Sequence, residues 1–512
     1  MIWDLGNFPG IMSRNGLFAA ALRVRGERTH TILCDGTPVA CIRRGIEYGE
    51  MGDNLRQWPQ RCPGCFSKAR QAADRYGLEY SAVGGYVSKA QREEFRRLAD
   101  SLPLDQLLDH VHLGANAGRM AWSSLNRHMK GVLVDIAELP KYEAEYRQYL
   151  YAALVNIHAA SEALKKLAPK SVLTSHGIYV DYAPPMSIAY QRSIPAVSWS
   201  SAYAERHHYF TLPKGPNLLL LQGVSSRELW ERRAKTALTA EEERRLETFL
   251  HHRYFKAGAR DIRVVANPEK TAALRKKLGL RGDRRVFAVF THVNWDACFD
   301  MSTMIYPNAN AWVVDTIHRA IDIKEIDWII RVHPGELTDG SVLSTGEIIK
   351  REFPRLPGHI KVLAADSDIN SYGLYQMIDG GITIFGTPGI EVAAIGKPVI
   401  LAGQAHYGDK GFTIDCASQD GYRAALARAA NVAPLDERQT ALARRYAYWY
   451  FVQRHIPINI IDHTQGHWGD IDIRRMDELL PGRDPILDSV CRNMVEGRDF
   501  ILPTEILPAA NG

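Results

Sequence analysis

The sequence predicts an α/β protein with two doubly wound, Rossmann-like domains, and three observations carry this prediction. The chain has 512 residues, which is too long for one ordinary hydrophobic core. In both halves, short β-branched runs alternate with segments of helical periodicity, an order typical of parallel sheets with helices on both faces. A highly charged stretch, residues 240–281, separates the halves. We therefore expect domains over residues 1–265 and 266–432, followed by a helical extension over residues 433–512.

The first half alternates strand and helix patterns in the order that a parallel sheet requires. "HTILCDGTPVACI" and "LEYSAVGGYVS" are each typical of a strand that is broken by turn residues. Residues 139–168 carry apolar positions at helical spacing and predict one long amphipathic helix. The stretch "SVLTSHGIYVDYAPPMSIAYQRSIPAVSWSS" then predicts a βαβ unit, in which His176 follows directly after a strand.

The second half repeats this alternation. "RVFAVFTHVNWD", "DWIIRVHPGE" and "HIKVLAAD" predict strands that end in polar residues, and "ANAWVVDTIHRAIDI" and "INSYGLYQMID" predict helices. In "ITIFGTPGIEVAAIGKPVILAG", two apolar runs flank a helix that we expect to begin near Pro388 and to end at Gly396. The aromatic-rich pattern over residues 436–456 predicts a long helix that crosses back onto the first domain.

Composition limits the class of protein. Hydrophobic residues make up 46% and charged residues 24%, which is typical of a soluble globular protein. The net charge of +5 is too small to indicate nucleic-acid binding. No run of 18 apolar residues and no signal-peptide pattern is present, so we expect a cytoplasmic protein. The seven cysteines, an odd number, do not suit a disulfide framework.

Polar residues follow the predicted strands of the second half. In open parallel sheets, ligands bind outside the carboxyl ends of the strands. Cations and hydroxyls there suit phosphate, and carboxylates suit ribose or sugar hydroxyls, so the set predicts a nucleotide-sugar site. Each residue taken alone is better explained as a helix cap or an ordinary loop residue, and it is the convergence of five strand ends that favours a binding site. The candidate residues are Asn294, Arg331, His333, Ser371, Thr387, Gly389, Glu391, His406 and Lys410.

Other motifs do not match. "AAIGKPV" lacks the upstream glycine and the following hydroxyl residue of a phosphate-binding loop. The sequence has no glycine-rich dinucleotide fingerprint, no nucleophile elbow and no His-Glu-x-x-His zinc helix. Four cysteines near the N-terminus include one Cys-x2-Cys pair and are compatible with a closed structural zinc site. Thiols that bind no metal are the alternative interpretation. These cysteines are Cys34, Cys41, Cys62 and Cys65.

The residues of the second half also resemble a known family. "NANAWVVDTI", "DWIIRVHPGE" and the long run from "INSYGLYQMID" to "AGQAHYGDKGFT" resemble the C-terminal half of bacterial capsule polysaccharide biosynthesis proteins. That group of GT-B-type glycosyltransferases includes the Kdo-transferring enzymes of capsule assembly. The resemblance is clearest over residues 286–415 and fainter through "SHGIYVDYAP". The chain departs from the family at residues 385–389, where one hydroxyl of the usual Ser-Thr-x-Gly turn is missing.

The resemblance implies a glycosyltransferase with two facing Rossmann-like domains. The C-terminal domain would hold a CMP-, UDP-, GDP- or dTDP-linked sugar, and a surface-polysaccharide acceptor, free or lipid-linked, would enter from the N-terminal side. Such enzymes generally need no catalytic metal, so no catalytic cofactor is expected, and peripheral contact with the inner membrane is compatible with this role. A sugar-nucleotide epimerase or hydrolase of the same architecture, or a non-catalytic polysaccharide assembly protein, remain alternatives.

The acceptor side is expected in the first half. The stretch "AGRMAWSSLNRHMK" contains more polar residues than a closed epimerase pocket requires. This favours an acceptor site at Ser123, Ser124 and Arg127. Sugar transfer with inversion needs a base that takes the proton of the acceptor hydroxyl. The strand ends of the first half offer three candidates for this base, in the order His176, Glu205 and Asp181. Transfer with retention would leave these residues only the role of positioning the acceptor.

Overall fold

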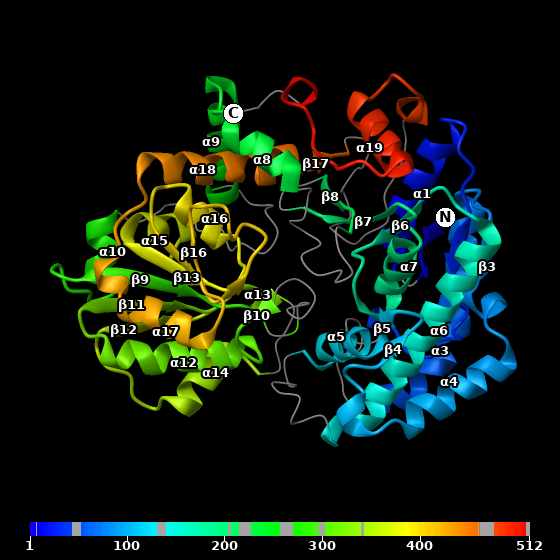
Figure 1. Cartoon of the computed structure of the whole chain (residues 1–512), viewed down its shortest axis with the longest axis horizontal. Helices are drawn as coiled ribbons and strands as arrows, with labels where there is room; N and C mark the ends of the chain where they lie inside the picture. The colour runs from blue at the N-terminus through cyan, green and yellow to red at the C-terminus, as the bar shows by residue number, and fades with distance from the viewer. Residues whose placement is uncertain are drawn as a thin grey trace. The chain divides into compact units, whose positions relative to one another are not determined.

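Two α/β units make up the chain. The computed structural model describes residues 1–6, 8–43, 53–130, 140–202, 206–213, 227–255, 270–293, 295, 303–338, 343–458, 460 and 476–507. Each unit contains one mainly parallel sheet covered by helices (Figure 1). The predicted α/β fold class with two Rossmann-like domains is therefore confirmed. Unit 1 comprises Met1–Met129, Ile136–Ser226 and Ile456–Leu507, and unit 2 comprises Lys130–Asp135, Arg227–His455 and Pro508–Gly512.

Unit 1 has a seven-stranded sheet in the order β17-β8-β7-β6-β1-β2-β3. The five strands from β7 to β3 are parallel, and β8 and β17 are antiparallel to their neighbours. Buried β-branched and apolar residues make these strands, as in "SVLTS" and "AVSWSS". Their bounds are β1 Ile2–Trp3, β2 Thr31–Leu33, β3 Tyr80–Ala82, β6 Val172–Ser175, β7 Ala196–Ser201, β8 His207–Thr211 and β17 Ile456–Pro457.

The helices of unit 1 form two groups. The first group packs around α1 (Pro9–Arg23), which contacts α3 (Asp53–Arg75) and α19 (Pro485–Glu496). The long helix predicted over residues 139–168 is confirmed as α6 (Glu143–Leu167), whose last turn ends at Ala168 in the left-handed conformation. Around α6 lie α4 (Lys89–Ser101), α5 (Ala117–Met129) and α7 (Tyr179–Gln191). The predicted βαβ unit is confirmed, because α7 connects the parallel strands β6 and β7.

Unit 2 has a six-stranded, fully parallel sheet in the order β12-β11-β9-β13-β14-β16. Along the chain, the strands begin with β9 in the middle of the sheet and continue through β11 to β12 at one edge. The next strand, β13, lies on the other side of β9, and β14 and β16 follow toward the opposite edge. The topology therefore switches direction between β9 and β13. The strand predicted over residues 382–385 begins two residues earlier. The bounds are β9 Arg285–Phe290, β11 Ile326–Arg331, β12 Ile360–Leu363, β13 Gly380–Thr383, β14 Val399–Leu401 and β16 Ile414–Asp415.

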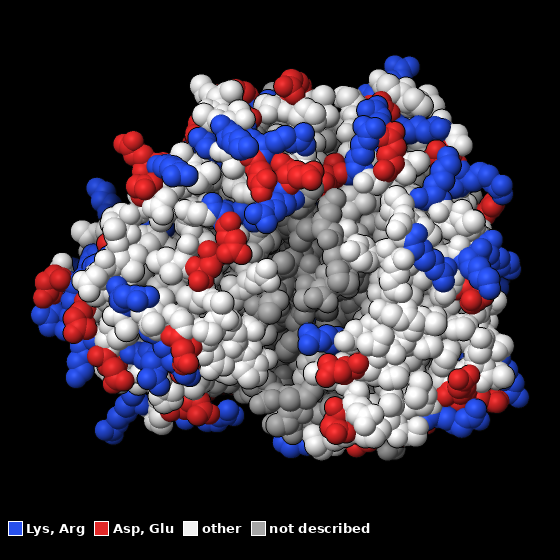
Figure 2. All heavy atoms as spheres, viewed as in Figure 1, with Lys and Arg blue, Asp and Glu red and all other residues white. Residues whose placement is uncertain are grey.

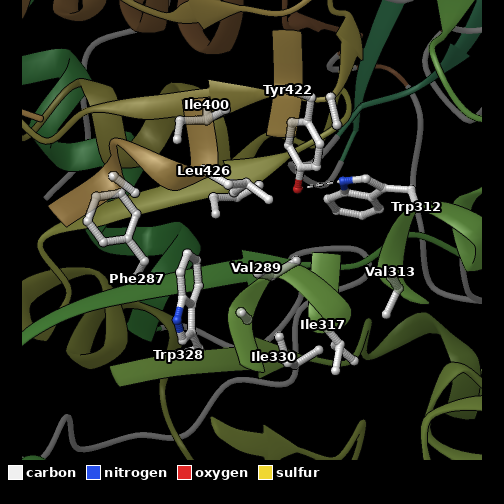
Figure 3. Packing of buried hydrophobic residues seen from close by; sticks show 14 of the residues in the cluster. Phe287, Val289, Trp312, Val313, Ile317, Trp328, Ile330, Ile400, Tyr422 and Leu426 are labelled. Atoms are coloured by element: carbon white, nitrogen blue, oxygen red, sulfur yellow. Dashed lines mark hydrogen bonds between the residues drawn. The ribbon is translucent and has the colours of Figure 1, made fainter. Parts of the chain in front are cut away.

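Helices cover both faces of this sheet (Figure 1). On one face lie α12 (Ala309–Asp322), α14 (Thr345–Glu352) and α17 (Gln419–Ala427), and on the other lie α10 (Thr271–Lys277), α15 (Ser371–Met377) and α16 (Pro388–Ala393). Figure 3 shows the core beneath the first group, where the indole Nε1 of Trp312 donates to the Tyr422 hydroxyl at 2.9 Å. The buried polar atoms of both large rings are thereby satisfied.

A third helical layer completes unit 2. Helix α18 (Glu437–Tyr448) packs on α16, on α8 (Arg227–Lys235) and on α9 (Ala240–Phe255). Arg444 of α18 forms an ion pair with Glu243 of α9. The units thus differ from the expected boundaries in two ways. The charged residues 240–255 belong to unit 2, and the chain returns to unit 1 only from Ile456 onward, after α18.

Charged side chains of both signs are mixed on the visible surface. On the face shown in Figure 2, groups of Lys and Arg lie next to groups of Asp and Glu, without a large area of one sign. This distribution agrees with the small net charge of +5. Among the described residues, no helix has the length and apolar character that crossing a lipid bilayer requires.

A histidine cluster in unit 1 predicts acid sensitivity. His112, in the hairpin of β4 (Val111–His112) and β5 (Ala115–Asn116), lies edge-on to Phe95 at 5.1 Å and 6.3 Å from the ring of His158. Burial, followed by the nearby His158 and His110, lowers the pKa of His112 from 6.5 to about 4. The unfolded chain therefore binds this proton first, and stability falls as the pH drops from 6.5 towards 4.

We expect His112→Leu to remove this part of the acid sensitivity. The variant should lose about 1–2 kcal/mol less stability than the wild type between neutral pH and pH 4.5. Urea unfolding at a series of pH values measures the difference. His251→Leu, at an exposed position of α9, is the control. Parallel pH profiles for His112→Leu and the wild type would contradict the prediction.

Candidate functional site

The polar residues predicted for ligand binding lie at the carboxyl edge of the unit 2 sheet. Because all six strands are parallel, their carboxyl ends share one edge. The switch point falls between the ends of β9 and β13, where the connections leave in opposite directions. Such a point is the usual ligand site of an open α/β sheet. We therefore describe the loops after β9, β11, β13 and β14 as the candidate site.

His292 joins the ends of β9 and β13. Its Nε2 lies 3.0 Å from the Thr383 hydroxyl, and the backbone N–H groups of Ile384 and Phe385 point at the same nitrogen at 3.3 and 3.4 Å. Burial, with a smaller contribution from His333, lowers the pKa of His292 from 6.5 to about 3. The imidazole is therefore neutral at physiological pH. A side chain at Gly386 would contact this ring, because its Cβ would lie 3.3 Å from Cε1 of His292.

His333 occupies the end of β11 in a fixed orientation. Its backbone N–H donates to the Thr291 hydroxyl at 3.0 Å, and its Nδ1 accepts from the N–H of Gly335 at 3.0 Å. The proton of the neutral ring is therefore on Nε2. The neighbouring Arg331 is buried and donates from Nη1 to the carbonyl of Ala364 at 2.8 Å. This bond links the ends of β11 and β12.

The turn from β13 into α16 is held by an arginine that the sequence interpretation did not include. Nε of Arg253, from α9, lies 3.1 Å from the Glu391 carboxylate, and Nη2 donates to the Thr387 hydroxyl at 2.9 Å. Both charged side chains are almost fully buried, with exposures of 6% and 1%. Burial and then the Glu391 charge raise the pKa values of Tyr254 and Tyr375 well above the usual range. The predicted ribose ligand Glu391 is thus already engaged in an ion pair.

Aromatic residues after β14 pack against the same turn. The Tyr407 hydroxyl donates to the Gly386 carbonyl at 2.6 Å, and a Cβ at Gly389 would lie only 2.2 Å from that hydroxyl oxygen. Glycine at 389 therefore permits close packing of Tyr407 on the turn. Nδ1 of His406 lies 2.7 Å from the Tyr446 hydroxyl of α18. Burial, and then nearby Arg454 and Lys410, lower the pKa of His406 to about 3.

The remaining predicted residues of the second half have mixed placements. Lys410 is half-buried, and burial lowers its pKa although two aspartates oppose this shift. Ser371 is the first residue of α15, whose N-terminus is capped by Asn370. The predicted helix over residues 388–396 is shorter and ends at Ala393, before Gly396 with its φ of +83°. Asn294 lies outside the described residues.

In unit 1, the main candidate for the catalytic base lies at a sheet end. His176 follows β6 with a φ of +52°, and its Nδ1 is 2.5 Å from the Ser175 hydroxyl. Its ring stacks on Tyr182 at 6.0 Å. A non-glycine residue in this conformation carries strain of about 1 kcal/mol, which surrounding contacts must offset. Strain of this kind is frequent at functional positions.

The other predicted acceptor-side residues of unit 1 that the structure describes lie on helices α5 and α7. The Ser124 hydroxyl accepts from the N–H of Val180 at 2.9 Å, and the buried Asp181 carboxylate accepts from the N–H of Ile42 at 3.2 and 3.3 Å. Ser123 is 1% exposed, and Arg127 is partly buried. Ser124 therefore holds the first turn of α7, and Asp181 links α7 to the backbone of Ile42. Glu205 lies outside the described residues.

Asp4 is a further buried acid in unit 1 that the sequence patterns did not indicate. It follows β1, the neighbour of β6, and accepts from Asn15 Nδ2 at 2.8 Å and from the N–H of Gly6 at 2.9 Å. Burial raises its pKa from 3.8 to about 6, against the opposing effect of these two hydrogen bonds. The only available signal was an aspartate directly after a short apolar run at the start of the chain.

The zinc site of the four N-terminal cysteines stays a prediction. Among the described residues, no group of three or more His, Cys, Asp or Glu side chains is placed to hold one metal ion. Cys34 Sγ instead accepts from the N–H of Gly36 at 3.3 Å, and Cys65 Sγ lies 3.6 Å from a guanidinium nitrogen of Arg43. Burial raises the pKa of the Cys34 thiol well above its usual range.

Solved structures resemble this chain only distantly. KpsC of Thermosulfurimonas dismutans, a β-Kdo 2,4 transferase, is 14% identical, with 61% of this chain and 87% of that chain covered and a TM-score of 0.36. The spinosyn rhamnosyltransferase SpnG is 12% identical, with 87% and 94% covered and a TM-score of 0.27. The UDP-GlcNAc 2-epimerase of Neisseria meningitidis is 7% identical, with 85% and 93% covered and a TM-score of 0.25. Similarities at this level support no inference about activity.

The family comparison is more specific. Among curated proteins, no sequence matches the chain. Residues 209–444 match the model of a family described as "Capsule polysaccharide biosynthesis protein". This segment contains every strand of the unit 2 sheet and all the candidate-site residues of that unit. Over residues 209–444, the chain is therefore matched to the capsule polysaccharide biosynthesis protein family, as the resemblance predicted.

Proposed function

We propose that the protein is a glycosyltransferase that moves a sugar from a nucleotide sugar to a polysaccharide acceptor of the capsule type. The observation that carries this proposal is the convergence of polar groups at the unit 2 switch point, within the segment that matches the capsule family. Switch points of this kind bind nucleotides in many α/β proteins. The family match supplies the polysaccharide context.

The chemistry of the switch point suits the phosphate part of such a donor. His333 carries its proton on Nε2 because Nδ1 already accepts a backbone hydrogen bond. The Thr387 hydroxyl accepts from Arg253, so its own proton is directed to another acceptor. Lys410 adds a cation in the loop after β14. Phosphate oxygens accept hydrogen bonds from such groups, and the buried network behind them fixes their positions before binding.

Unit 1 would supply the acceptor side. In the proposed reaction, the acceptor hydroxyl oxygen attacks the anomeric carbon while the bond from that carbon to the phosphate oxygen breaks. The bonding electron pair leaves with the phosphate. If the configuration inverts, His176 takes the proton of the acceptor hydroxyl, which is the role of a positioned general base.

Product analysis distinguishes the proposed function from its alternatives. Purified protein is incubated with labelled nucleotide sugars, with and without a capsule-type glycan acceptor. Transfer of label to the glycan supports the proposal. Conversion or hydrolysis of the nucleotide sugar without acceptor indicates an epimerase or hydrolase, and an unchanged donor that still binds indicates an assembly protein. A thermal-shift screen of CMP, UDP, GDP and dTDP selects the nucleotide, since saturation at 100 times Kd stabilises by about 2.7 kcal/mol.

We expect His333→Ala to weaken binding of the selected nucleotide. Loss of one hydrogen bond to a charged oxygen costs roughly 1.5–3 kcal/mol, which corresponds to about a 10- to 150-fold higher Kd. Isothermal titration calorimetry measures the change. His318→Ala, at an exposed position of α12, should leave the Kd unchanged. An unaltered Kd in His333→Ala would remove this residue from the site.

A further inference from the structure

The imidazole of His292 has one nitrogen whose function the fold does not explain. The ring is buried to 7% exposure and lies at the switch point itself, between the ends of β9 and β13. Phe385 covers it at a centroid distance of 4.3 Å. A polar ring in this position needs partners for both of its nitrogens, because an unmade hydrogen bond in a buried place is costly.

The hydrogen bonds of Nε2 determine where the proton is. Two backbone N–H groups, those of Ile384 and Phe385, point at Nε2, and a backbone N–H can only donate. Nε2 is therefore the acceptor nitrogen of a neutral ring. The proton is on Nδ1, and the low pKa of about 3 keeps the ring in this neutral form.

The second nitrogen then presents an N–H donor. Among the described residues, no hydrogen bond to Nδ1 of His292 is made. The ring is more than nine-tenths buried, and its Nδ1–H is engaged by no described group. An oriented donor of this kind at a topological switch point is suited to a ligand acceptor.

We propose that Nδ1–H of His292 donates a hydrogen bond to a phosphate oxygen of the bound nucleotide sugar. This inference rests on the proposed function. The Nδ1–H group of His292 can only donate a hydrogen bond, so its partner in the ligand must be an acceptor atom. The oxygens of an ionised phosphate are such acceptors. The neighbouring His333 also carries its neutral-ring proton on the nitrogen that the backbone leaves available. No proton is transferred in this contact.

His292→Gln tests the contact. Glutamine can keep an acceptor oxygen for the N–H groups of Ile384 and Phe385, but it has no counterpart of the Nδ1–H donor. We expect the Kd of the nucleotide selected from CMP, UDP, GDP and dTDP to rise roughly 10- to 100-fold, with a small change in the thermal midpoint of the ligand-free protein. The matched control is His359→Gln. That buried histidine precedes β12, at the opposite edge of the sheet, and bonds the Ala320 carbonyl.

Each outcome decides between the two proposals. If the wild type binds none of the four nucleotides, the proposed function is overturned. If the wild type binds and His292→Gln binds equally well, the inference about His292 is overturned and the proposed function stands. If His292→Gln does not fold, NMR of wild-type protein with ¹⁵N-labelled histidine decides. A change in the His292 Nδ1 resonance on nucleotide binding supports the contact, and an unchanged resonance overturns it.

Discussion

Arg253→Met is expected to lower the thermal midpoint of the protein by on the order of 10 °C. The substitution leaves the buried Glu391 carboxylate, 1% exposed, without its cation. Breaking a buried ion pair on one side costs about 3–5 kcal/mol, because one charge remains in a poorly solvated place. In domains of this size, each kcal/mol corresponds to about 2–4 °C. Differential scanning calorimetry of both proteins measures the shift.

Two further variants separate this explanation from a general effect of losing an arginine. The double variant Arg253→Met/Glu391→Gln removes both charges and should regain most of the lost stability. Arg444→Met breaks the ion pair with Glu243, which is partly exposed and also involves α9. That control should cost less than about 1 kcal/mol. Equal losses in Arg253→Met and Arg444→Met would contradict the prediction.

The ion pair between Arg253 and Glu391 also affects how variants of the proposed donor site are interpreted. Glu391→Ala alone leaves the buried Arg253 unpaired, so weaker nucleotide binding in that variant would not show direct contact with the ligand. Nucleotide binding is therefore better measured in the double variant Arg253→Met/Glu391→Gln, in which neither buried charge is left without its partner. Thr387→Val retains the ion pair and removes only the hydroxyl that accepts from Arg253.

His176→Ala is expected to reduce turnover by roughly 10²-fold or more while nucleotide binding persists. A positioned general base contributes about 10²- to 10⁴-fold to the rate, and His176 lies at the carboxyl end of β6 with its ring held by Ser175 and Tyr182. The measurement is kcat with saturating donor and acceptor. Nucleotide affinity is measured by calorimetry on the same preparation.

The control for His176 is Asp181→Asn. Asp181 binds the backbone of Ile42, so its replacement should lower stability more than it lowers the turnover of the folded protein. Glu205→Gln tests the remaining candidate base. Near-normal turnover in His176→Ala would exclude His176 from this role, and a large loss in Glu205→Gln alone would assign the role to Glu205.

The fold class followed from local patterns in the sequence. Runs such as "RVFAVF" and "DWIIRV" are buried on both faces, and only a parallel sheet that is covered by helices on both sides buries strands in this way. The right-handed connections between such strands leave few topologies, so the strand-end positions of His333 and Thr387 could be expected. The family resemblance strengthened the same interpretation over residues that local periodicity had already assigned.

The pairs that define the site were not predictable in this way. Arg253 and Glu391 are 138 positions apart, and His292 and Thr383 are 91 positions apart. The charged stretch that contains Arg253 was interpreted as a link between domains, because a helix rich in Glu and Arg gives no sign of which side chain is buried. Arg253 is buried because α9 packs against α18, which in turn covers α16.

The sequence by itself therefore determined the elements, their order and the edge of the sheet at which polar residues gather, because these depend on interactions between near neighbours in the chain. Only the tertiary structure decided the ionisation and hydrogen-bonding state of that edge. Burial keeps His292 neutral, two backbone N–H groups select its tautomer, and Arg253 occupies Glu391. The physical reason is that desolvation and partner geometry depend on packing between distant segments, which no local pattern encodes.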